Sequence, residues 1–194
     1  MKKIIFILTV ISFIALTAII YLNESPEQLS LTEPPQGGDF VLNTQEGKFS
    51  LEKQRGKVVL IYFGYTFCPD ICPTNLSLMA QALNELSESE LNEVVPVFIS
   101  VDPERDTVDQ LHNYTNYFHS RILGMTGSEA SIAKISQQYG AAYQKVTGES
   151  DGGYLIDHSS FTYLVDKHGN LAEIFPHATD PMVMIESIRK LLQY

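Results

Sequence analysis

Two continuous apolar runs constrain the fold of this chain more than any other feature. They cover residues 58–63 and 94–101. Runs without polar alternation are typical of strands that are buried on both faces of a sheet. Each run is followed by a segment with apolar residues at helical spacing, at 73–86 and at 108–118. This alternation of strands and helices predicts an α/β fold.

The rest of the chain adds an antiparallel part to the fold. The remaining predicted elements are a hairpin across 40–51, a short strand at 122–125, a helix at 128–139, a strand, tight turn and strand across 161–175, and a helix that opens at Asp180-Pro181. The first half therefore favours parallel strands, whereas the closing strand pair is antiparallel. A mixed central sheet flanked by helices accommodates both.

The N-terminus contains an apolar run at residues 4–22, with no charge inside it. A run of roughly 19 residues is about long enough to cross a bilayer as a helix. Lys2 and Lys3 favour a cytoplasmic N-terminus at residues 1–3. A cleaved signal peptide is the alternative, but no small-x-small cleavage pattern stands near Leu22. We therefore expect a single uncleaved transmembrane anchor.

The segment after the anchor is polar and rich in proline and glycine, and we expect it to be a linker at 23–38. A single domain then follows at 39–194. This topology places the domain on the extracytoplasmic, periplasmic side of an inner or cytoplasmic membrane, where disulfides persist. The formal net charge of −10 argues against nucleic acid as a partner, because phosphate binding needs a basic face.

Cys68 and Cys72 are the two cysteines of the chain, and they lie four residues apart at the end of the first buried strand. Residues at this spacing share one face of a helix. Two thiols on one face can close a disulfide, hold a soft metal ion, or do each in turn. A purely structural disulfide is the weaker explanation, because closing so short a loop removes little entropy from the unfolded chain.

The position of the pair favours metal chemistry. A helix N-terminus stabilises thiolate, and two thiolates favour Cu(I), with Zn(II) as a competitor. Two ligands leave such an ion under-coordinated, so a third donor is expected from elsewhere in the chain.

Five histidines could supply that donor. His112 and His119 fall in a predicted helix as surface or partly packed groups, His168 lies in a turn that is usually exposed, and His177 has no partner signal. His158 lies in a loop just before a predicted strand. Spacing alone leaves open whether His158 meets the cysteines or caps a strand end.

The chain resembles the Sco/SenC family of copper-binding cytochrome c oxidase assembly proteins over about residues 37–192. Several ordered blocks are far more specific than one C-x-x-x-C motif. The matching blocks are Tyr62-Phe63-Gly64-Tyr65-Thr66-Phe67-Cys68-Pro69-Asp70-Ile71-Cys72-Pro73-Thr74, Ser100-Val101-Asp102-Pro103-Glu104-Arg105-Asp106-Thr107, Leu123-Gly124-Met125-Thr126-Gly127 and Asp157-His158-Ser159.

The resemblance implies a thioredoxin-like fold, in agreement with the predicted order of elements. It also implies that copper, as Cu(I) and Cu(II), is bound by Cys68, Cys72 and His158. It further implies a role in assembling the copper A centre of cytochrome c oxidase. With the predicted anchor, the chain is therefore expected to be a membrane-anchored copper metallochaperone. The expected partners are the copper-site subunit of the oxidase and, beyond it, another copper chaperone or a thiol–disulfide reductant.

Two aspartates are candidates for an outer shell around this site. Asp102 either orients a ligand or is simply a turn aspartate before Pro103. Asp70 is expected to cap the helix that carries Cys72, or to tune the field at its N-terminus. Tyr65 and Phe67 are expected either to form an apolar wall or partner surface near the site, or to pack in the core.

Two further functions compete with the metallochaperone, which is not itself an enzyme. One is a thiol–disulfide oxidoreductase that reduces the copper-site cysteines of the oxidase subunit, with Cys68 and Cys72 as its redox pair. The other is a redox or copper sensor. The C-x-x-x-C spacing departs from the thioredoxin C-x-x-C, and a purely redox site needs no histidine ligand. A peroxidase is disfavoured because its two cysteines are usually well separated.

Overall fold

The computed structural model describes residues 34–146 and 153–193. The predicted anchor at 4–22, its cytoplasmic end and most of the predicted linker lie outside the described residues. Among the residues that are described, no helix is both long and apolar enough to cross a membrane.

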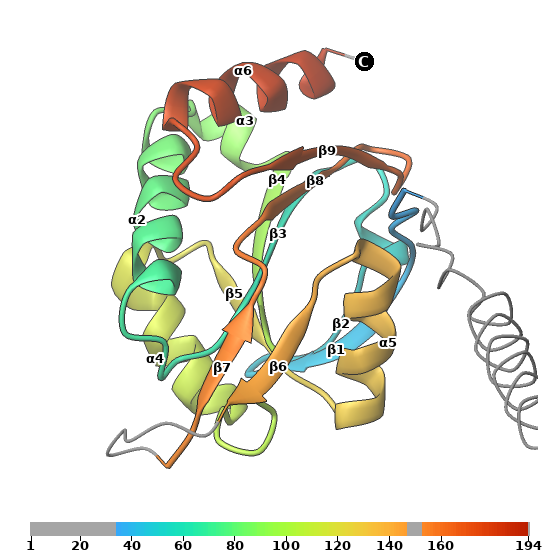
Figure 1. The fold of residues 1–194 in the computed structure, drawn as a ribbon. Helices are drawn as coiled ribbons and strands as arrows, with labels where there is room; N and C mark the ends of the chain where they lie inside the picture. The colour runs from blue at the N-terminus through green and yellow to red at the C-terminus, as the bar shows by residue number, and fades with distance from the viewer. Residues whose placement is uncertain (1–33, 147–152, 194) are drawn as a thin grey trace, which may run out of the picture. The chain divides into compact units, whose positions relative to one another are not determined.

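A five-stranded mixed sheet forms the centre of the domain, in the order β5-β4-β3-β8-β9 (Figure 1). β3 (Val58–Gly64), β4 (Val94–Ser100) and β5 (Leu123–Met125) run parallel. β8 (Thr162–Val165) is antiparallel to β3, and β9 (Leu171–Phe175) is antiparallel to β8. Every residue of β3 and β4 is buried, as the two continuous apolar runs predict.

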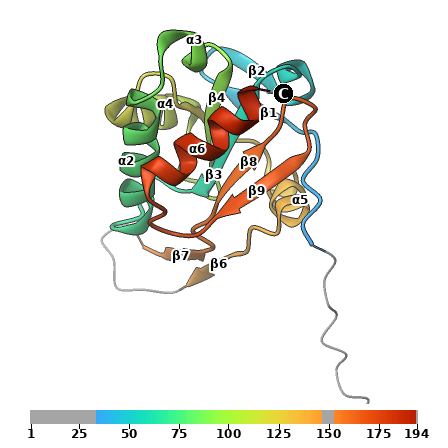
Figure 2. The same ribbon diagram turned by 90° about the horizontal axis from the view of Figure 1, so that it is seen from above.

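Helices cover both faces of this sheet. α2 (Ile71–Asn84) and α5 (Glu129–Tyr139) lie on opposite sides of it (Figures 1 and 2). α2 packs against both α4 (Val108–Phe118) and α6 (Pro181–Leu192). The expectation of a mixed sheet flanked by helices is therefore confirmed.

The predicted N-terminal hairpin is confirmed as β1 (Val41–Thr44) paired with β2 (Gly47–Ser50). Two short helices were not predicted, η1 (Glu52–Gln54) and α3 (Glu88–Leu91). Helices of one turn are too short to show a helical period. α3 nevertheless carries a capping box, because Ser87 and Glu90 each bind the other's backbone N–H.

A second strand pair was also missed. β6 (Tyr143–Val146) pairs antiparallel with β7 (Leu155–His158), outside the central sheet. Only one residue of the two strands, Ile156, is buried, so apolar alternation could not reveal them. The loop expected at His158 is therefore wrong: His158 is the last residue of β7 and is paired with Tyr143.

Candidate metal centre

The two cysteines lie where β3 passes into α2. Cys72 is in the first turn of α2, whereas Cys68 lies in the turn before the helix and donates its backbone N–H to Tyr65 O at 3.3 Å. The expectation that both lie on one helical face is therefore wrong for Cys68. Both thiols are free, and they are 8% and 0% exposed, respectively.

His158 meets this pair from the end of β7. Its Nε2 lies 3.2 Å from Cys72 Sγ, and the ligand atoms of Cys68, Cys72 and His158 all lie within 4.8 Å of one another. Its Nδ1 lies 3.1 Å from the carbonyl oxygen of Ser159. Because a carbonyl only accepts, Nδ1 is the donor in this contact, and Nε2 is the ring nitrogen that faces the cysteines. A metal ion at this site would therefore bind Nε2, with the Nδ1–H held by the carbonyl.

Two tyrosine rings hold the imidazole in place. Tyr65 meets it edge-on with ring centroids 5.7 Å apart, and Tyr62 does so at 6.3 Å. The hydroxyl of Tyr65 also accepts the backbone N–H of Ile156 at 3.2 Å, which ties β7 to the segment before Cys68. Tyr65 is therefore a buried wall of the site, as one of its two predicted roles requires.

The two thiols differ sharply in acidity. A hydrogen bond from Cys72 is the largest cause that lowers the pKa of Cys68, to about 4. His158 and the backbone N–H groups of Asp70 and Cys72 lower the same pKa further, against the opposing effect of burial. Burial raises the pKa of Cys72, as do its hydrogen bond to Cys68 and the charge there. The reduced, metal-free site is thus a thiolate beside a thiol, and a metal ion must displace the remaining proton.

A depression of about 380 Å³ opens over the site. Its lining residues are Tyr65, Cys68, Pro69, Asp70, Ile71, Leu155, Ile156, Asp157 and His158. Cys72 does not line it and is completely buried. An incoming ion or partner group therefore reaches Cys68 and His158 first, with Cys72 behind them.

Asp102 is completely buried, but its hydrogen bonds do not go to the three candidate ligands. Its carboxylate pairs with Arg105 and accepts the hydroxyl of Tyr154 at 2.7 Å. The Arg105 guanidinium lies over the rings of Tyr154 and Phe67, with centroid distances of 3.7 and 4.7 Å. Asp102 is therefore connected to the surroundings of the site through an aromatic and guanidinium stack. Phe67 is 46% exposed and belongs to that stack rather than to the core.

Asp70 stands at the N-cap of α2, but its side chain makes no capping hydrogen bond. The expectation that its carboxylate caps the helix is therefore wrong. The backbone of Asp70 makes the local hydrogen bonds instead. The carbonyl accepts the N–H of Thr74 at 3.2 Å and the hydroxyl of Thr74 at 3.0 Å, and the N–H of Asp70 bonds Cys68.

The other four histidines lie elsewhere, as expected. His112 and His119 are half-buried at α4, whereas His168 and His177 are exposed in turns. Among the described residues, the group of metal-binding side chains contains none of them.

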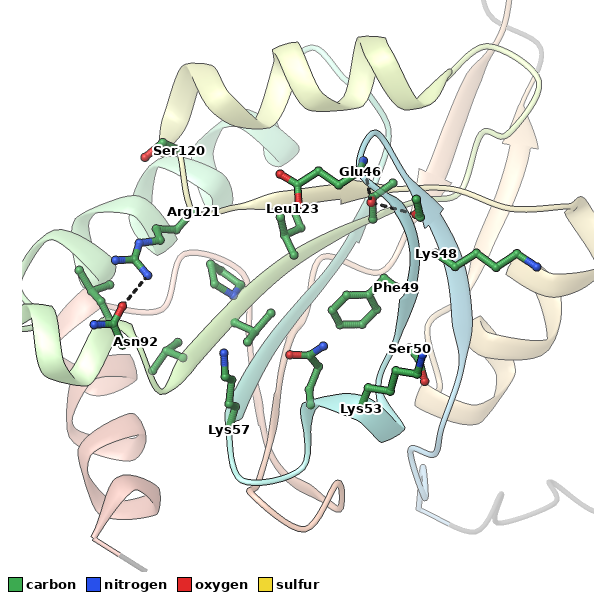
Figure 3. Close-up of a pocket in the computed structure, with 17 residues that line it drawn as sticks. Glu46, Lys48, Phe49, Ser50, Lys53, Lys57, Asn92, Ser120, Arg121 and Leu123 are labelled. Atoms are coloured by element: carbon green, nitrogen blue, oxygen red, sulfur yellow. Dashed lines mark hydrogen bonds between the residues drawn. The ribbon is translucent and has the colours of Figure 1, made fainter.

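A second depression, of about 430 Å³, lies at the opposite end of the sheet, where β3 and β4 begin (Figure 3). Lys53, Lys57 and Arg121 line it beside the apolar Phe49 and Leu123. No cysteine or histidine lines it, so it lacks the donor set of the cysteine site.

Sequence reasoning missed one buried polar pair beside Cys72. Tyr62 in β3 and Asn75 in α2 are 0% and 2% exposed and are hydrogen-bonded to each other. The available signal was a tyrosine inside a continuous apolar run and an asparagine on the apolar face of a helix.

The fold and this group of side chains define a thioredoxin-like domain with a candidate soft-metal site at the carboxyl end of a buried strand. The chain belongs to the SCO1/SenC family, whose model matches residues 30–193. It is 41% identical over 155 residues to an SCO2-like protein of Rickettsia conorii, covering 79% of this chain and 75% of that protein.

Solved structures agree with this membership. Arabidopsis thaliana ScoI with copper bound superposes with a TM-score of 0.74 at 39% identity, covering 81% of this chain and 99% of that one. A second solved structure is that of BsSco, which is described as having a disulfide switch and as a member of the Sco family of cytochrome c oxidase assembly proteins. It superposes with a TM-score of 0.66 at 25% identity, covering 83% of this chain and 95% of that one. The resemblance to the Sco/SenC family is thereby confirmed.

Proposed function

We propose that this protein is a membrane-anchored copper metallochaperone that serves assembly of the copper A centre of cytochrome c oxidase. In this proposal, Cys68, Cys72 and His158 bind Cu(I) and Cu(II). The observation that carries it is the gathering of the three ligand atoms within 4.8 Å of one another. The copper-bound structure of the Arabidopsis relative supports the choice of metal.

The donor set suits an ion that is carried and then released. Thiolates favour Cu(I), imidazole also suits Cu(II), and a mixed set can hold both. Three protein ligands leave room for a donor from a partner. The depression over Cys68 and His158 gives that donor a path to the ion.

The proposed acceptor is the copper-site subunit of the oxidase. The description of BsSco as a member of a family of oxidase assembly proteins supports an oxidase partner. A second copper chaperone would load the site, or a thiol–disulfide reductant would keep its cysteines reduced. In this proposal residues 4–22 anchor the chain and place the domain on the periplasmic side.

A thiol–disulfide oxidoreductase is the second candidate function. The lowered pKa of Cys68 favours it, because thiolate is the attacking form in disulfide exchange. The disulfide switch of BsSco points the same way. In that case Cys68 attacks the substrate disulfide, and Cys72, buried behind it, resolves the mixed disulfide. Copper binding and this exchange use the same sulfurs and exclude one another at any moment.

An anaerobic titration of the reduced protein with Cu(I), and in parallel with Cu(II), tests the proposal. One tight equivalent of each ion, with a sulfur-to-copper charge-transfer band for Cu(II), is the expected result. Absence of tight copper binding, together with a readily cycled disulfide, would assign the reductase function instead.

A further inference from the structure

A buried polar pair lies directly behind the proposed copper site, on the side away from solvent. The hydroxyl of Tyr62 is 3.8 Å from Cys72 Sγ, and Asn75 Nδ2 is 3.1 Å from the same hydroxyl oxygen. Both side chains lie among the apolar residues of β3 and α2. A polar pair buried this deeply is costly unless its hydrogen bonds are satisfied.

The chemistry of the pair fixes the direction of its hydrogen bonds. An amide nitrogen donates and does not accept, so the oxygen of Tyr62 accepts from Asn75. The hydroxyl hydrogen of Tyr62 then points to Cys72 Sγ, the acceptor within its reach. Cys72 therefore receives a hydrogen bond from a buried hydroxyl in addition to its contact with His158.

Asn75 is itself held by two more hydrogen bonds. Its Nδ2 donates to the carbonyl of Ser160 at 3.1 Å, and its Oδ1 accepts the backbone N–H of Ala178 at 3.1 Å. Ser160 is two residues after His158. Ala178 adopts a φ of +57°, a conformation that residues other than glycine rarely adopt. Asn75 thus ties α2 both to the segment that carries His158 and to the loop before α6.

We propose that Tyr62, oriented by Asn75, is a positioning residue that donates a hydrogen bond to the Cys72 sulfur and so adjusts the copper–sulfur bond. This inference rests on the proposed copper site. A hydrogen bond to a ligating sulfur withdraws electron density from it, and such bonds tune the redox potential of copper–thiolate sites. Because Cu(II) needs sulfur donation more than Cu(I), the Tyr62 hydroxyl shifts the site's preference toward Cu(I).

The test uses the full chain with Tyr62→Phe, loaded with Cu(II). Loss of the hydrogen bond raises the energy of the sulfur donor orbitals, so the sulfur-to-copper band moves to lower energy. The ratio of the Cu(II) to the Cu(I) dissociation constant falls by about 10-fold, a change of the size that outer-shell substitutions make in metal affinity. Copper stoichiometry stays at one equivalent.

Tyr139→Phe is the matched control. Tyr139 is also completely buried, and its hydroxyl donates to Gly38 O at 3.0 Å, with no part in the cysteine site. Like Tyr62→Phe, the Tyr139→Phe substitution removes one buried hydroxyl oxygen from the core, so a general loss of stability affects both variants. The control should keep the wild-type band.

Asn75→Asp supplies a second, independent variant. An aspartate at this position accepts from the Tyr62 hydroxyl and turns its hydrogen away from Cys72. It should shift the band in the same direction as Tyr62→Phe while the tyrosine remains, and it decides the matter if Tyr62→Phe does not fold. An unshifted band in the folded, copper-loaded variants overturns the inference. A wild-type protein without any sulfur-to-copper band would instead refute the copper site itself.

Discussion

Cys72 Sγ and His158 Nε2 lie 3.2 Å apart, although 86 residues separate them in the chain. The sheet explains the encounter. β8 is antiparallel to β3, and Thr162 at its start pairs with Tyr62 near the end of β3. The residues just before β8 therefore arrive at the carboxyl end of β3, where α2 and its first-turn cysteine begin.

His158→Ala should weaken Cu(II) binding more than Cu(I) binding, because two thiolates alone can still hold Cu(I). Parallel titrations with the two ions measure the difference. His168→Ala, which removes an exposed turn histidine, is the matched control and should change neither affinity. Undiminished affinity of His158→Ala for both ions would remove this histidine from the site.

Cys72→Ser should abolish both copper binding and the intramolecular disulfide, because Cys72 is one of the chain's two cysteines. Metal analysis after desalting reports the copper content, and mass spectrometry of the oxidised protein reports the disulfide. Wild-type copper stoichiometry in this variant is incompatible with the proposed ligand set.

The reduced, metal-free protein should react with iodoacetamide at Cys68 before Cys72. The pKa of Cys68 is lowered to about 4, so its thiolate persists at neutral pH and is lost only as the pH falls through about 4. The pKa of Cys72 is raised, so that residue stays protonated. Alkylation rates measured by mass spectrometry across pH should show this order.

The same measurement on Cys72→Ala tests the cause of the shift. The hydrogen bond from Cys72 is the largest cause that lowers the pKa of Cys68, so its removal should move the Cys68 titration to higher pH. An unmoved titration would mean that the helix terminus and His158, rather than the neighbouring thiol, stabilise the thiolate.

Gly64→Ala should distort the site from within β3. A Cβ at this position would lie 2.6 Å from Cys72 Sγ and 2.8 Å from Phe98, closer than real contacts allow. We expect a loss of about 1–3 kcal/mol in the free energy of unfolding, the usual cost of overpacking a core, together with weaker copper binding.

Gly127→Ala is the control for this crowding. Its Cβ would meet the flexible end of Leu42 at 2.7 Å, away from the cysteines. Denaturant unfolding and copper titration of both variants should show altered copper binding in Gly64→Ala alone. Equal copper affinity in the two variants would show that the sulfur of Cys72 has room to move.

Asp102→Ala should destabilise the fold while copper stoichiometry is kept. Asp102 is completely buried and pairs with Arg105, so its removal leaves a largely buried guanidinium without its carboxylate. Breaking such a pair typically costs about 3–5 kcal/mol. Asp39→Ala is the control, because its ion pair with Arg55 is exposed and should be worth less than about 1 kcal/mol. A folded Asp102→Ala protein that has lost copper would make Asp102 a ligand-orienting group after all.

The buried strands and the cysteine pair were predictable because their signals are local. An apolar run such as 58–63 is stable as a strand only when both of its faces are buried inside a sheet. The loop that carries Cys68 follows it directly. Helix starts were also readable: Thr107 and Asp180 cap α4 and α6, as their residue types suggest.

The rest of the site depends on tertiary contacts that leave little trace in the sequence. β7, which carries His158, has a single buried residue and is defined by its pairing with β6. Asp70 occupies an N-cap position, yet its backbone rather than its carboxylate serves the site. The partnership of Tyr62 with Asn75 exists only because α2 packs over β3 at that point.

X-ray absorption at the copper edge of the loaded protein tests the central claim most directly, because it reports the atoms bound to the metal. The account predicts two sulfur ligands and one imidazole nitrogen in the wild type. It also predicts that the imidazole contribution is lost in His158→Ala. A copper shell made of nitrogen and oxygen alone would contradict the proposed function.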